Sequence, residues 1–372
     1  MNHPIVLSGY YGELNSGDDA LLIAAAWGSM HILGANAIQA TCAQLPALPD
    51  SVNMDSLFVQ KENIKSENLF TLYQACINAD YLLYGGGSVF HSSDKMARDC
   101  DLLDLNRRKG GAAVGVSFGP FRDSGAEAVA SRLADNFFYI GCRDEESVDI
   151  IQKIAPQANV EKTFDLAVLL PLAANSTFSY PAAKKRGLGL AFCHYERYIG
   201  KEKIIEAKRV NKLIETLNRL TVDDVEELVF IDFNGHPLFG DTGIHKEIIE
   251  GLHTNIPIKH LHYHRDPIQV LKTIAQLKGI VGMRLHSSIF GYITNTPTII
   301  LSYHPKCDGW AKQIAASQTF TIDSQKFEID QLQQAILAIL AGKYEQPGLP
   351  LKEAQKLAMK NWEGVLCSMS QL

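Results

Sequence analysis

One stretch decides the expected fold: Gly279–Cys307, which reads GIVGMRLHSSIFGYITNTPTIILSYHPKC. Its apolar start predicts a short strand that ends at Val281, and a helix is expected over Ser287–Tyr292 directly behind it. Pro297–Leu301 predict a second strand. A strand, a helix and a second strand in close succession are typical of a parallel sheet in an α/β domain.

Polar side chains follow both of these expected strands. Arg284 and His286 come after the first strand, and Tyr303, His304 and Lys306 come after the second. Ligands of open α/β sheets bind at the carboxyl ends of the strands, and a helix N-terminus favours anions. The stretch therefore predicts a site for an anionic ligand that includes an acid–base side chain.

Length and composition describe an ordinary globular protein with two domains. The chain has 372 residues, of which 46% are hydrophobic and 20% are charged; this length exceeds what a single core usually supports. A formal net charge of -6 argues against a surface for nucleic acid.

Cysteine usage and apolar runs bear on location. The 7 cysteines include no CxxC pair, which suits reduced thiols. The first residues resemble no signal peptide, and no apolar run reaches the ~18 residues of a membrane span. We expect a cytoplasmic protein, and peripheral association with the inner face of the membrane is left open.

The first half begins with a strand over residues 4–8, a glycine-rich loop over Gly9–Leu22 and a largely apolar helix over Ala20–Leu33. This order resembles dinucleotide-binding loops but lacks the GxGxxG spacing. A tight turn between a strand and a helix explains the loop equally well.

A glycine triplet, Gly85, Gly86 and Gly87, follows an expected strand over Asp80–Tyr84. Consecutive glycines let backbone N–H groups approach an anion closely. The alternative is a close contact with a crossing segment of chain. We favour the ligand interpretation, because this loop should share a sheet edge with the Gly9 loop.

Arg143 follows a short expected strand over Phe138–Cys142 and precedes a helix. Its position predicts a second cationic contact for a ligand, and the alternative is a surface salt bridge to Asp144 or Glu146. Strands and helices alternate up to this point, which predicts a doubly wound parallel domain.

The same alternation resumes after a linker over residues 171–186. We therefore expect an α/β protein of GT-B-like architecture, with two doubly wound Rossmann-like domains that face each other across a cleft. Residues 1–175 would form the first domain and residues 176–345 the second. Residues 346–372 would form a C-terminal helix that packs back across the junction.

Three histidines, His260, His262 and His264, alternate along an expected strand over residues 258–264. Their common face suggests a metal site. No carboxylate or cysteine stands at a matching spacing, however, and Lys259 and Arg265 flank the set. We expect a polar strand face near a cleft and assign no metal.

Several segments then carry a family resemblance, in order along the chain. They are GYYGELNSGDDALL (residues 9–22), YGGGSVF (84–90), SFGP (117–120), RDEES (143–147), FDLA (164–167) and GMRLHSSIFG (282–291), followed by Pro297, Tyr303 and Lys306. With these segments the chain resembles the polysaccharide pyruvyl transferase family over nearly its whole length.

Two positions depart from the family pattern. Asp19 stands where the family usually has Glu, which shortens the reach of the carboxylate, so Asp19 is left out of the expected site. Gly291 stands where the family often carries Ala, and this predicts a local change in packing.

The resemblance implies transfer of a ketal-forming group from phosphoenolpyruvate to two hydroxyls of a sugar, with phosphate leaving and no cofactor. It also implies a glycan or lipid-linked saccharide acceptor in exopolysaccharide or cell-envelope synthesis. Arg284, Arg143 and Lys306 would hold the donor's carboxylate and phosphate.

Other residues would share the remaining work. His286 would act as the acid–base group, because its ordinary pKa lies near neutrality; Arg284 would act beside it. Gly85, Gly86 and Gly87 would hold an anionic group, and Asn15 and Asp18 would orient acceptor hydroxyls.

Alternatives remain open at this point. His286 could be a hydrogen-bonded imidazole that only braces the Arg284 loop, and Asp165 could simply cap a helix. The chain could be a GT-B glycosyltransferase with a nucleotide-sugar donor, or a binding protein without turnover. No motif names the acceptor sugar, the ketal stereochemistry or the oligomeric state.

Overall fold

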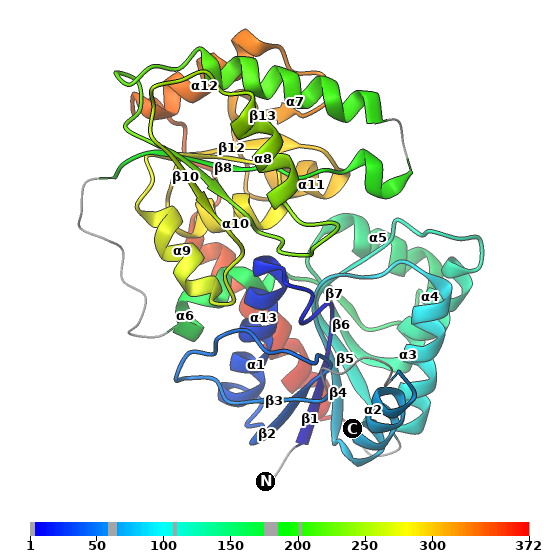
Figure 1. Cartoon of the computed structure of the whole chain (residues 1–372). Helices are drawn as coiled ribbons and strands as arrows, with labels where there is room; N and C mark the ends of the chain where they lie inside the picture. Colours follow the sequence, from blue (N-terminus) through cyan, green and yellow to red (C-terminus); the bar gives the residue numbers. More distant parts are fainter. Residues whose placement is uncertain (1–3, 59–64, 107–109, 175–184, 201–202, 372) are drawn as a thin grey trace. The chain divides into compact units, whose positions relative to one another are not determined.

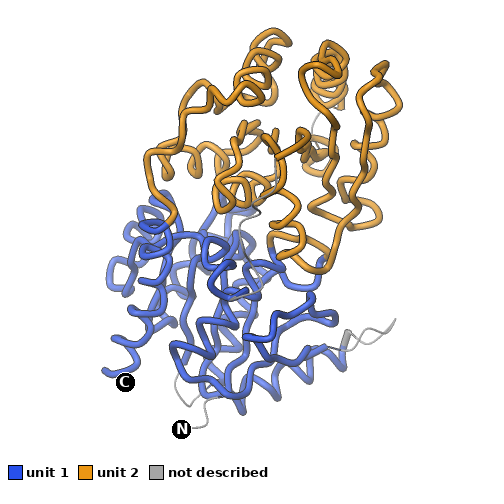
Figure 2. Tube along the Cα trace, turned by 90° about the vertical axis from the view of Figure 1, so that its left-hand side faces the viewer, with its two compact units in different colours: residues 1–13, 18–177, 352–372 blue, residues 14–17, 178–351 orange. Residues whose placement is uncertain are grey.

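A computed structural model describes residues 4–58, 65–106, 110–174, 185–200 and 203–371. The chain forms two compact units, coloured separately in Figure 2. Unit 1 comprises residues 1–13, 18–177 and 352–372, and unit 2 comprises residues 14–17 and 178–351. Residues 14–17, which the sequence places in the first domain, therefore belong to unit 2. Most of the expected linker, residues 175–184, lies outside the described residues.

Unit 1 is built on a parallel sheet with strand order β3-β2-β1-β4-β5-β6-β7 (Figure 1). Its strands are β1 (Pro4–Ser8), β2 (Ala37–Ala40), β3 (Asp55–Ser56), β4 (Tyr81–Phe90), β5 (Gly111–Phe118), β6 (Phe137–Cys142) and β7 (Val160–Lys162). Its helices are α1 (Ser16–His31), α2 (Lys65–Asn78), α3 (Ser93–Leu105), α4 (Ala126–Asn136), α5 (Glu145–Ile154), the 3-10 helix η1 (Leu166–Leu169), α6 (Leu170–Ala174) and α13 (Leu351–Met369).

Unit 2 repeats the plan with strand order β10-β9-β8-β11-β12-β13. Its strands are β8 (Leu188–Ala191), β9 (Leu228–Ile231), β10 (Ile258–Leu261), β11 (Gly279–Gly282), β12 (Thr298–Ser302) and β13 (Thr321–Asp323). Its helices are η3 (Glu196–Ile199), α7 (Lys203–Asn218), α8 (Thr242–Glu250), α9 (Pro267–Ala275), α10 (Leu285–Ile293), α11 (Pro305–Gln313), η4 (Gln318–Phe320) and α12 (Ile329–Leu340).

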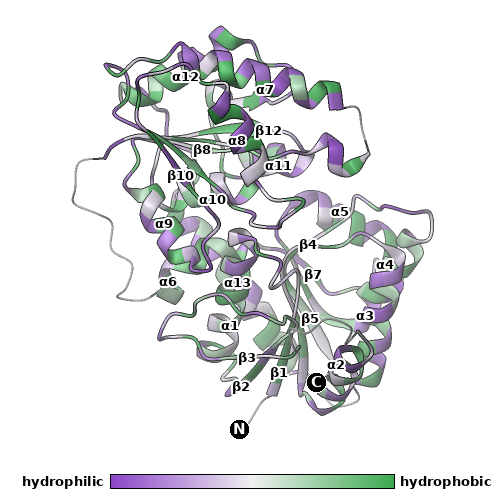
Figure 3. Ribbon diagram, viewed as in Figure 1, coloured by the Kyte–Doolittle hydropathy of each residue, from purple (hydrophilic) through white to green (hydrophobic). Residues whose placement is uncertain are grey.

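The cores explain why both sheets are parallel. Every residue of β5 and every residue of β11 is buried. Strands buried on both faces need helices on both faces, and helical crossovers supply them. Figure 3 shows the same pattern, with hydrophobic colours along the strands and mixed colours on helices such as α4 and α7. Each unit has its own apolar cluster.

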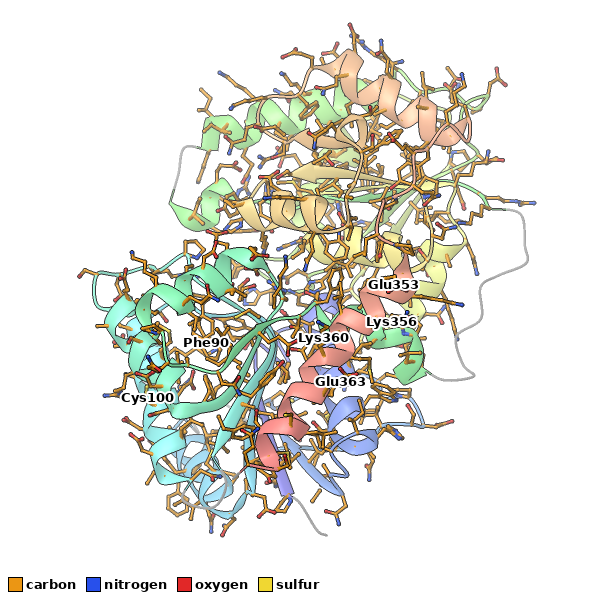
Figure 4. All side chains as sticks on the ribbon, turned by 180° about the vertical axis from the view of Figure 1, so that it is seen from behind. Phe90, Cys100, Glu353, Lys356, Lys360 and Glu363 are labelled. Carbon is orange, nitrogen blue, oxygen red and sulfur yellow. The ribbon has the colours of Figure 1, made fainter. Side chains whose placement is uncertain are left out.

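The C-terminal helix α13 returns the chain to unit 1. A Cβ on Gly28 of α1 would lie 2.1 Å from the Trp362 ring, so the two helices pack closely. Asn361 Oδ1 accepts hydrogen bonds from Gly115 N (2.7 Å) and Thr163 Oγ1 (2.9 Å). The opposite face carries the charged side chains labelled in Figure 4, Glu353, Lys356, Lys360 and Glu363. None of the helices described here is long and apolar enough to cross a membrane.

Candidate active site

The strand and helix expected around Arg284 are confirmed by β11 and α10, and Arg284 is the N-cap residue of α10. Its Nε and Nη2 atoms donate to Asp241 Oδ1 at 2.9 and 2.6 Å. Among the described residues, no group accepts a hydrogen bond from Nη1, and 19% of the side chain is exposed. One edge of the guanidinium is thus held by Asp241. On the other edge, Nη2 has a long contact with Phe239 O (3.5 Å), and Nη1 is available to a ligand.

Asp241 is itself fixed by the backbone. It is fully buried, and its Oδ2 atom accepts from Phe233 N (3.0 Å) and Asn234 N (2.9 Å), just beyond β9. Because those bonds anchor the carboxylate, the orientation of Arg284 is set by two elements of unit 2, the β9–α8 connection and the N-terminus of α10.

Residues 14–17 reach the same part of unit 2. Ser16 N donates to Phe233 O (2.9 Å), and Asn15 forms an isolated antiparallel β-bridge with Asn234. A Cβ on Gly17 would lie 2.1 Å from His286 Nδ1, so the imidazole packs directly against the Gly17 backbone. The structure therefore brings Asn15 and His286 into one region of unit 2. The Asn15 Oδ1 atom accepts from Gly17 N (3.0 Å) and shapes this turn.

Lys306 lies in the first turn of α11, where it is exposed. Its Nζ atom is 5.7 Å from the centre of the Tyr303 ring. His304 is the N-cap of α11 and accepts from Lys306 N at 3.2 Å. Burial and the neighbouring Lys306 lower the pKa of His304 to about 4, so its imidazole is neutral and caps the helix.

A pocket opens next to this helix, at the carboxyl ends of β12 and β13. It is lined by Ser302, Tyr303, His304, Pro305, Asp308, Asp323, Gln325 and Lys326. Neither Arg284 nor His286 lines it, so it adjoins the predicted site without containing its central residues.

Arg143, in unit 1, is buried, with 6% of the residue exposed. Its guanidinium donates to Ser117 Oγ through Nε (2.7 Å), to Asp165 Oδ2 through Nη1 (2.7 Å) and to Ser88 Oγ through Nη2 (2.9 Å). The alternative of a salt bridge to Asp144 is present only as a long contact, with Nε 3.9 Å from Oδ2, and the guanidinium is buried and not on the surface. The guanidinium, which follows β6, joins the carboxyl-terminal parts of β4 and β5 to the segment after β7.

Asp165 has two tasks in this network. It caps η1 by accepting from Ala167 N (2.9 Å), as the capping interpretation predicts, and it also pairs with Arg143. Asp144 similarly caps α5 by accepting from Ser147 N (2.9 Å) and binds the Ser117 hydroxyl (2.5 Å).

The glycine triplet lies inside β4, whereas the sequence predicts it after the strand. Gly85 and Gly87 pair with Val114 and Val116 of β5, and the register then shifts before Phe90. The strand continues because β5 is long enough to pair with it, which the apolar run before the triplet cannot indicate.

Packing accounts for two of the three glycines. A Cβ on Gly85 would lie 2.5 Å from Tyr11 Oη, and one on Gly86 would lie 2.8 Å from Leu21 Cδ2. Gly87, at φ 86°, leaves more room: a Cβ there would be 3.6 Å from Leu21 and 4.0 Å from Asp18 Oδ1. Within the triplet, Gly87 is thus the position at which a ligand could approach beside Asp18.

The expected strand over residues 258–264 ends at Leu261, and two of its three histidines, His260 within β10 and His262 just after it, do meet a carboxylate, which corrects the sequence argument. Asp232, just after the neighbouring strand β9, accepts from His260 Nε2 (2.8 Å) and His262 Nδ1 (3.0 Å). His245 Nδ1 and Thr242 Oγ1 also donate to it, both at 2.6 Å. Spacing along one strand missed this carboxylate because it comes from another strand. His264 instead accepts from Asp266 N.

Asp232, His245 and His260 place ligand atoms within 4.8 Å of one another, close enough to consider a metal ion. His245 Nε2, however, accepts from Phe192 N (3.0 Å), so its proton lies on Nδ1 and is donated to Asp232. A histidine with both nitrogens engaged has no lone pair for a metal. These hydrogen bonds hold the pKa of Asp232 well below its usual value, against the effect of burial.

One of the two departures from the family pattern has a structural reason. A Cβ on Gly291 would lie 2.1 Å from Thr298 Oγ1, so α10 approaches β12 more closely than an alanine would allow. Asp19 is buried in the first turn of α1, with 2% exposed. Ser88, Ser117 and Asp241 were not predicted, because no spacing connects them to the arginines that they bind.

Comparison with solved structures identifies the fold. A UDP-GlcNAc 2-epimerase from Methanocaldococcus jannaschii is similar, with a TM-score of 0.60 and 13% identity over 97% of this chain and 100% of that one. A Neisseria meningitidis UDP-GlcNAc 2-epimerase bound to UDP-GlcNAc has a TM-score of 0.55 and 10% identity, with 100% of both chains covered. The lipopolysaccharide outer core galactosyltransferase WaaB has a TM-score of 0.50 and 10% identity over 99% of this chain and 100% of that chain. At these identities the similarity shows the fold alone, which is GT-B with two Rossmann-like units.

Comparison of sequences identifies the family. No curated protein matches the sequence significantly. The family model of polysaccharide pyruvyl transferase matches residues 15–305, which begin at Asn15 and include the glycine triplet, Arg143, Arg284 and His286. The chain therefore belongs to the polysaccharide pyruvyl transferase family.

Proposed function

We propose that this transferase moves the carboxyethylidene group of phosphoenolpyruvate onto two hydroxyls of a sugar and releases phosphate. The acceptor is a glycan or a lipid-linked saccharide destined for an exopolysaccharide or the cell envelope. The reaction takes place in the cytoplasm, where phosphoenolpyruvate is available, and needs no cofactor.

One observation supports this proposal most strongly: Arg284, the N-cap residue of α10, leaves Nη1 available, and His286 lies in the first turn of the same helix. An arginine edge can bind a carboxylate or phosphate with two parallel hydrogen bonds. The positive end of the α10 dipole points to the same place and favours an anion. Lys306, in the first turn of α11, is the second cation that unit 2 would offer to the donor.

The chemistry assigns each proton. A proton adds to C3 of phosphoenolpyruvate, which becomes a methyl group, and leaves an oxocarbenium-like centre at C2. One sugar hydroxyl attacks C2 and loses its proton. Phosphate then departs from C2, and the second hydroxyl attacks and loses its proton. Of the two hydroxyl protons, one balances the proton on C3 and the other leaves with phosphate. His286 is the group that we assign to these transfers.

Turnover is the test of this proposal. Purified protein is incubated with phosphoenolpyruvate and galactosyl, mannosyl or glucosyl acceptors, and both phosphate release and the mass of the acceptor are followed. Activity should fall by about 100-fold or more in His286→Ala, as is usual when an acid–base group is removed. His253→Ala, which changes an exposed histidine of unit 2, is the matched control. Full activity of His286→Ala would overturn the assignment of His286.

The rival function is a glycosyltransferase with a nucleotide-sugar donor, since the galactosyltransferase WaaB has the same fold. Thermal unfolding with each donor separates the two functions. Phosphoenolpyruvate, but not UDP-glucose or UDP-galactose, should raise the Tm, because binding to the native state alone is stabilising. A shift with the nucleotide sugars only would favour the rival.

A further inference from the structure

A second cluster of cationic and aromatic side chains lies in unit 1, at the carboxyl edge of its sheet. Tyr10 follows β1, His91 follows β4, and Arg122 follows β5, which are neighbouring strands. Lys95 comes from the first turn of α3. The backbone ties the edge together, because Arg122 N donates to His91 O at 2.8 Å. None of these residues has a place in the proposed chemistry of unit 2.

The geometry of the cluster is close. Tyr10 Oη lies 2.5 Å from His91 Nε2, and the Lys95 ammonium lies 4.0 Å from the centre of the Tyr10 ring. A phenol is a better donor than acceptor, so the Tyr10 hydroxyl donates to Nε2 and the His91 proton lies on Nδ1. The position of Lys95 over the Tyr10 ring is a cation–π contact, which holds the ammonium in place without neutralising it.

Two features of the cluster point to a missing ligand. His91 is 9% exposed, and its Nδ1 atom is buried with no hydrogen-bond partner. A buried N–H without a partner is costly and therefore uncommon. Moreover, neither Lys95 nor Arg122 forms an ion pair within the described parts of the chain.

Both charged groups that act on His91 are positive. Burial, Arg122 and Lys95 together lower the pKa of His91 to about 4, so the ring is neutral at neutral pH. The carboxylates of the region are Asp18, Asp99 and Glu13, which act on Tyr10; Asp99 and Asp18 also act on Lys95, although neither forms an ion pair with it within the described residues. An anion beside Nδ1 would meet one N–H donor and two positive charges.

We propose that Tyr10, His91, Lys95 and Arg122 form a subsite for a phosphoryl group carried by the acceptor saccharide. Two cations and an N–H donor suit a dianionic, tetrahedral group better than a single hydroxyl. This inference rests on the proposed function in one respect, which is that the ligand of the subsite is the acceptor. The phosphoryl group could belong to a sugar 1-phosphate, a nucleotide sugar or a lipid-linked diphosphate.

Direct binding tests the subsite without turnover. Calorimetry compares galactose 1-phosphate, UDP-galactose and a short-chain polyprenyl diphosphate galactoside with methyl galactoside, and repeats the series with glucose and mannose. At least one phosphorylated ligand should bind ten-fold or more tightly than its neutral glycoside, and the best of the three identifies the source of the phosphoryl group. Equal affinity of neutral and phosphorylated ligands in every series would overturn the subsite.

Variants locate the binding. Lys95→Gln and Arg122→Gln should each weaken the phosphorylated ligand ten-fold or more and leave the affinity for phosphoenolpyruvate unchanged, whereas Lys153→Gln, an exposed lysine of α5, should change neither. His91→Asn keeps a donor near the Nδ1 position and should retain more affinity than His91→Gln. If the Lys95 and Arg122 variants lose phosphoenolpyruvate instead, the cluster belongs to the donor and the assignment is wrong. Loss of catalysis with phosphoryl binding intact would contradict only the proposed reaction.

Discussion

Two arginines, one in each unit, look equivalent in the sequence, since each follows a strand and precedes a helix. In the structure they differ. Arg143 donates from all of its guanidinium nitrogens to Ser88, Ser117 and Asp165, and 7% of its side chain is exposed. Arg284 uses one edge for Asp241 and keeps 19% of its side chain exposed.

The difference separates structural from ligand-binding roles. A buried guanidinium that donates from every nitrogen inside the protein has little left to offer a ligand, and a buried carboxylate partner is expensive to abandon. Arg143 therefore acts chiefly by holding the ends of several strands together. Arg284 remains the better candidate to bind the donor, because one of its edges needs no rearrangement.

The largest expected effect follows from removing Arg143. Arg143→Ala leaves Asp165 without its counter-ion while 97% of that side chain is buried, since only 3% is exposed. The loss in the free energy of unfolding should be about 3–5 kcal/mol, measured by chemical denaturation. Arg132→Ala, which breaks an exposed pair with Asp101 (3.6 Å), should cost less than about 1 kcal/mol. If Arg143→Ala is as stable as the wild type but binds phosphoenolpyruvate poorly, the distinction between the two arginines fails.

Arg284→Lys should affect binding more than stability. A lysine keeps the charge next to Asp241 but cannot form the second, parallel hydrogen bond to a carboxylate or phosphate. We expect the KM for phosphoenolpyruvate to rise by roughly 10–100-fold, about 1.4–2.7 kcal/mol, with a smaller change in kcat. Initial rates at varied donor concentration measure both. An unchanged KM would remove Arg284 from the donor site.

For the two arginines, the sequence predicts the local strands and helices but not the hydrogen-bond partners. The strand and helix around Arg284 follow from an apolar run and a helix start, both local features, and β11 and α10 confirm them. The prediction that each arginine lies between a strand and a helix is correct for the same reason. Their different partners were beyond reach, because Asp241 and Asp165 come from connections whose proximity only the folded sheets create. The glycine triplet failed similarly, since its strand is prolonged by pairing with β5.

Helix α3 of unit 1 carries a buried carboxylate, Asp99. Asp99 is 1% exposed, and its Oδ2 atom has no hydrogen-bond partner among the described residues. Burial raises the pKa of Asp99 from 3.8 to about 6, although Lys95 opposes the shift. The stability that the protonated form gives is fully present below pH 3.8 and is lost as the pH rises through about 6.

Asp99→Asn should therefore be more stable than the wild type at pH 7.5, by about 2 kcal/mol, and the gap should close towards pH 4. Urea denaturation at a series of pH values measures both chains. Asp232→Asn in unit 2 should behave oppositely, because hydrogen bonds from histidines and Thr242 keep that carboxylate charged. Parallel curves for the wild type and Asp99→Asn would show that folding does not raise the pKa of Asp99.

The smallest effect is expected at Gly87. If Arg143 uses its donors inside the protein, Gly87 is the remaining residue of the family motifs in unit 1 that could contact an anion. Gly87 has φ 86° and Gly34 has φ 71°, and a Cβ meets nothing closer than 3.6 Å at Gly87 and nothing within 4 Å at Gly34. Each Gly→Ala change should thus cost about 1 kcal/mol of stability through backbone strain alone.

The two variants should differ only in binding. A methyl group on Gly87 would stand beside Asp18, where the backbone N–H would meet the ligand, so Gly87→Ala should raise a KM by several-fold while Gly34→Ala leaves it unchanged. The substrate whose KM rises tells which molecule approaches the triplet. Should both variants keep wild-type kinetics, the triplet serves packing alone, as Tyr11 and Leu21 already require of Gly85 and Gly86. Unit 1 would then contact anions through its side chains and not through β4.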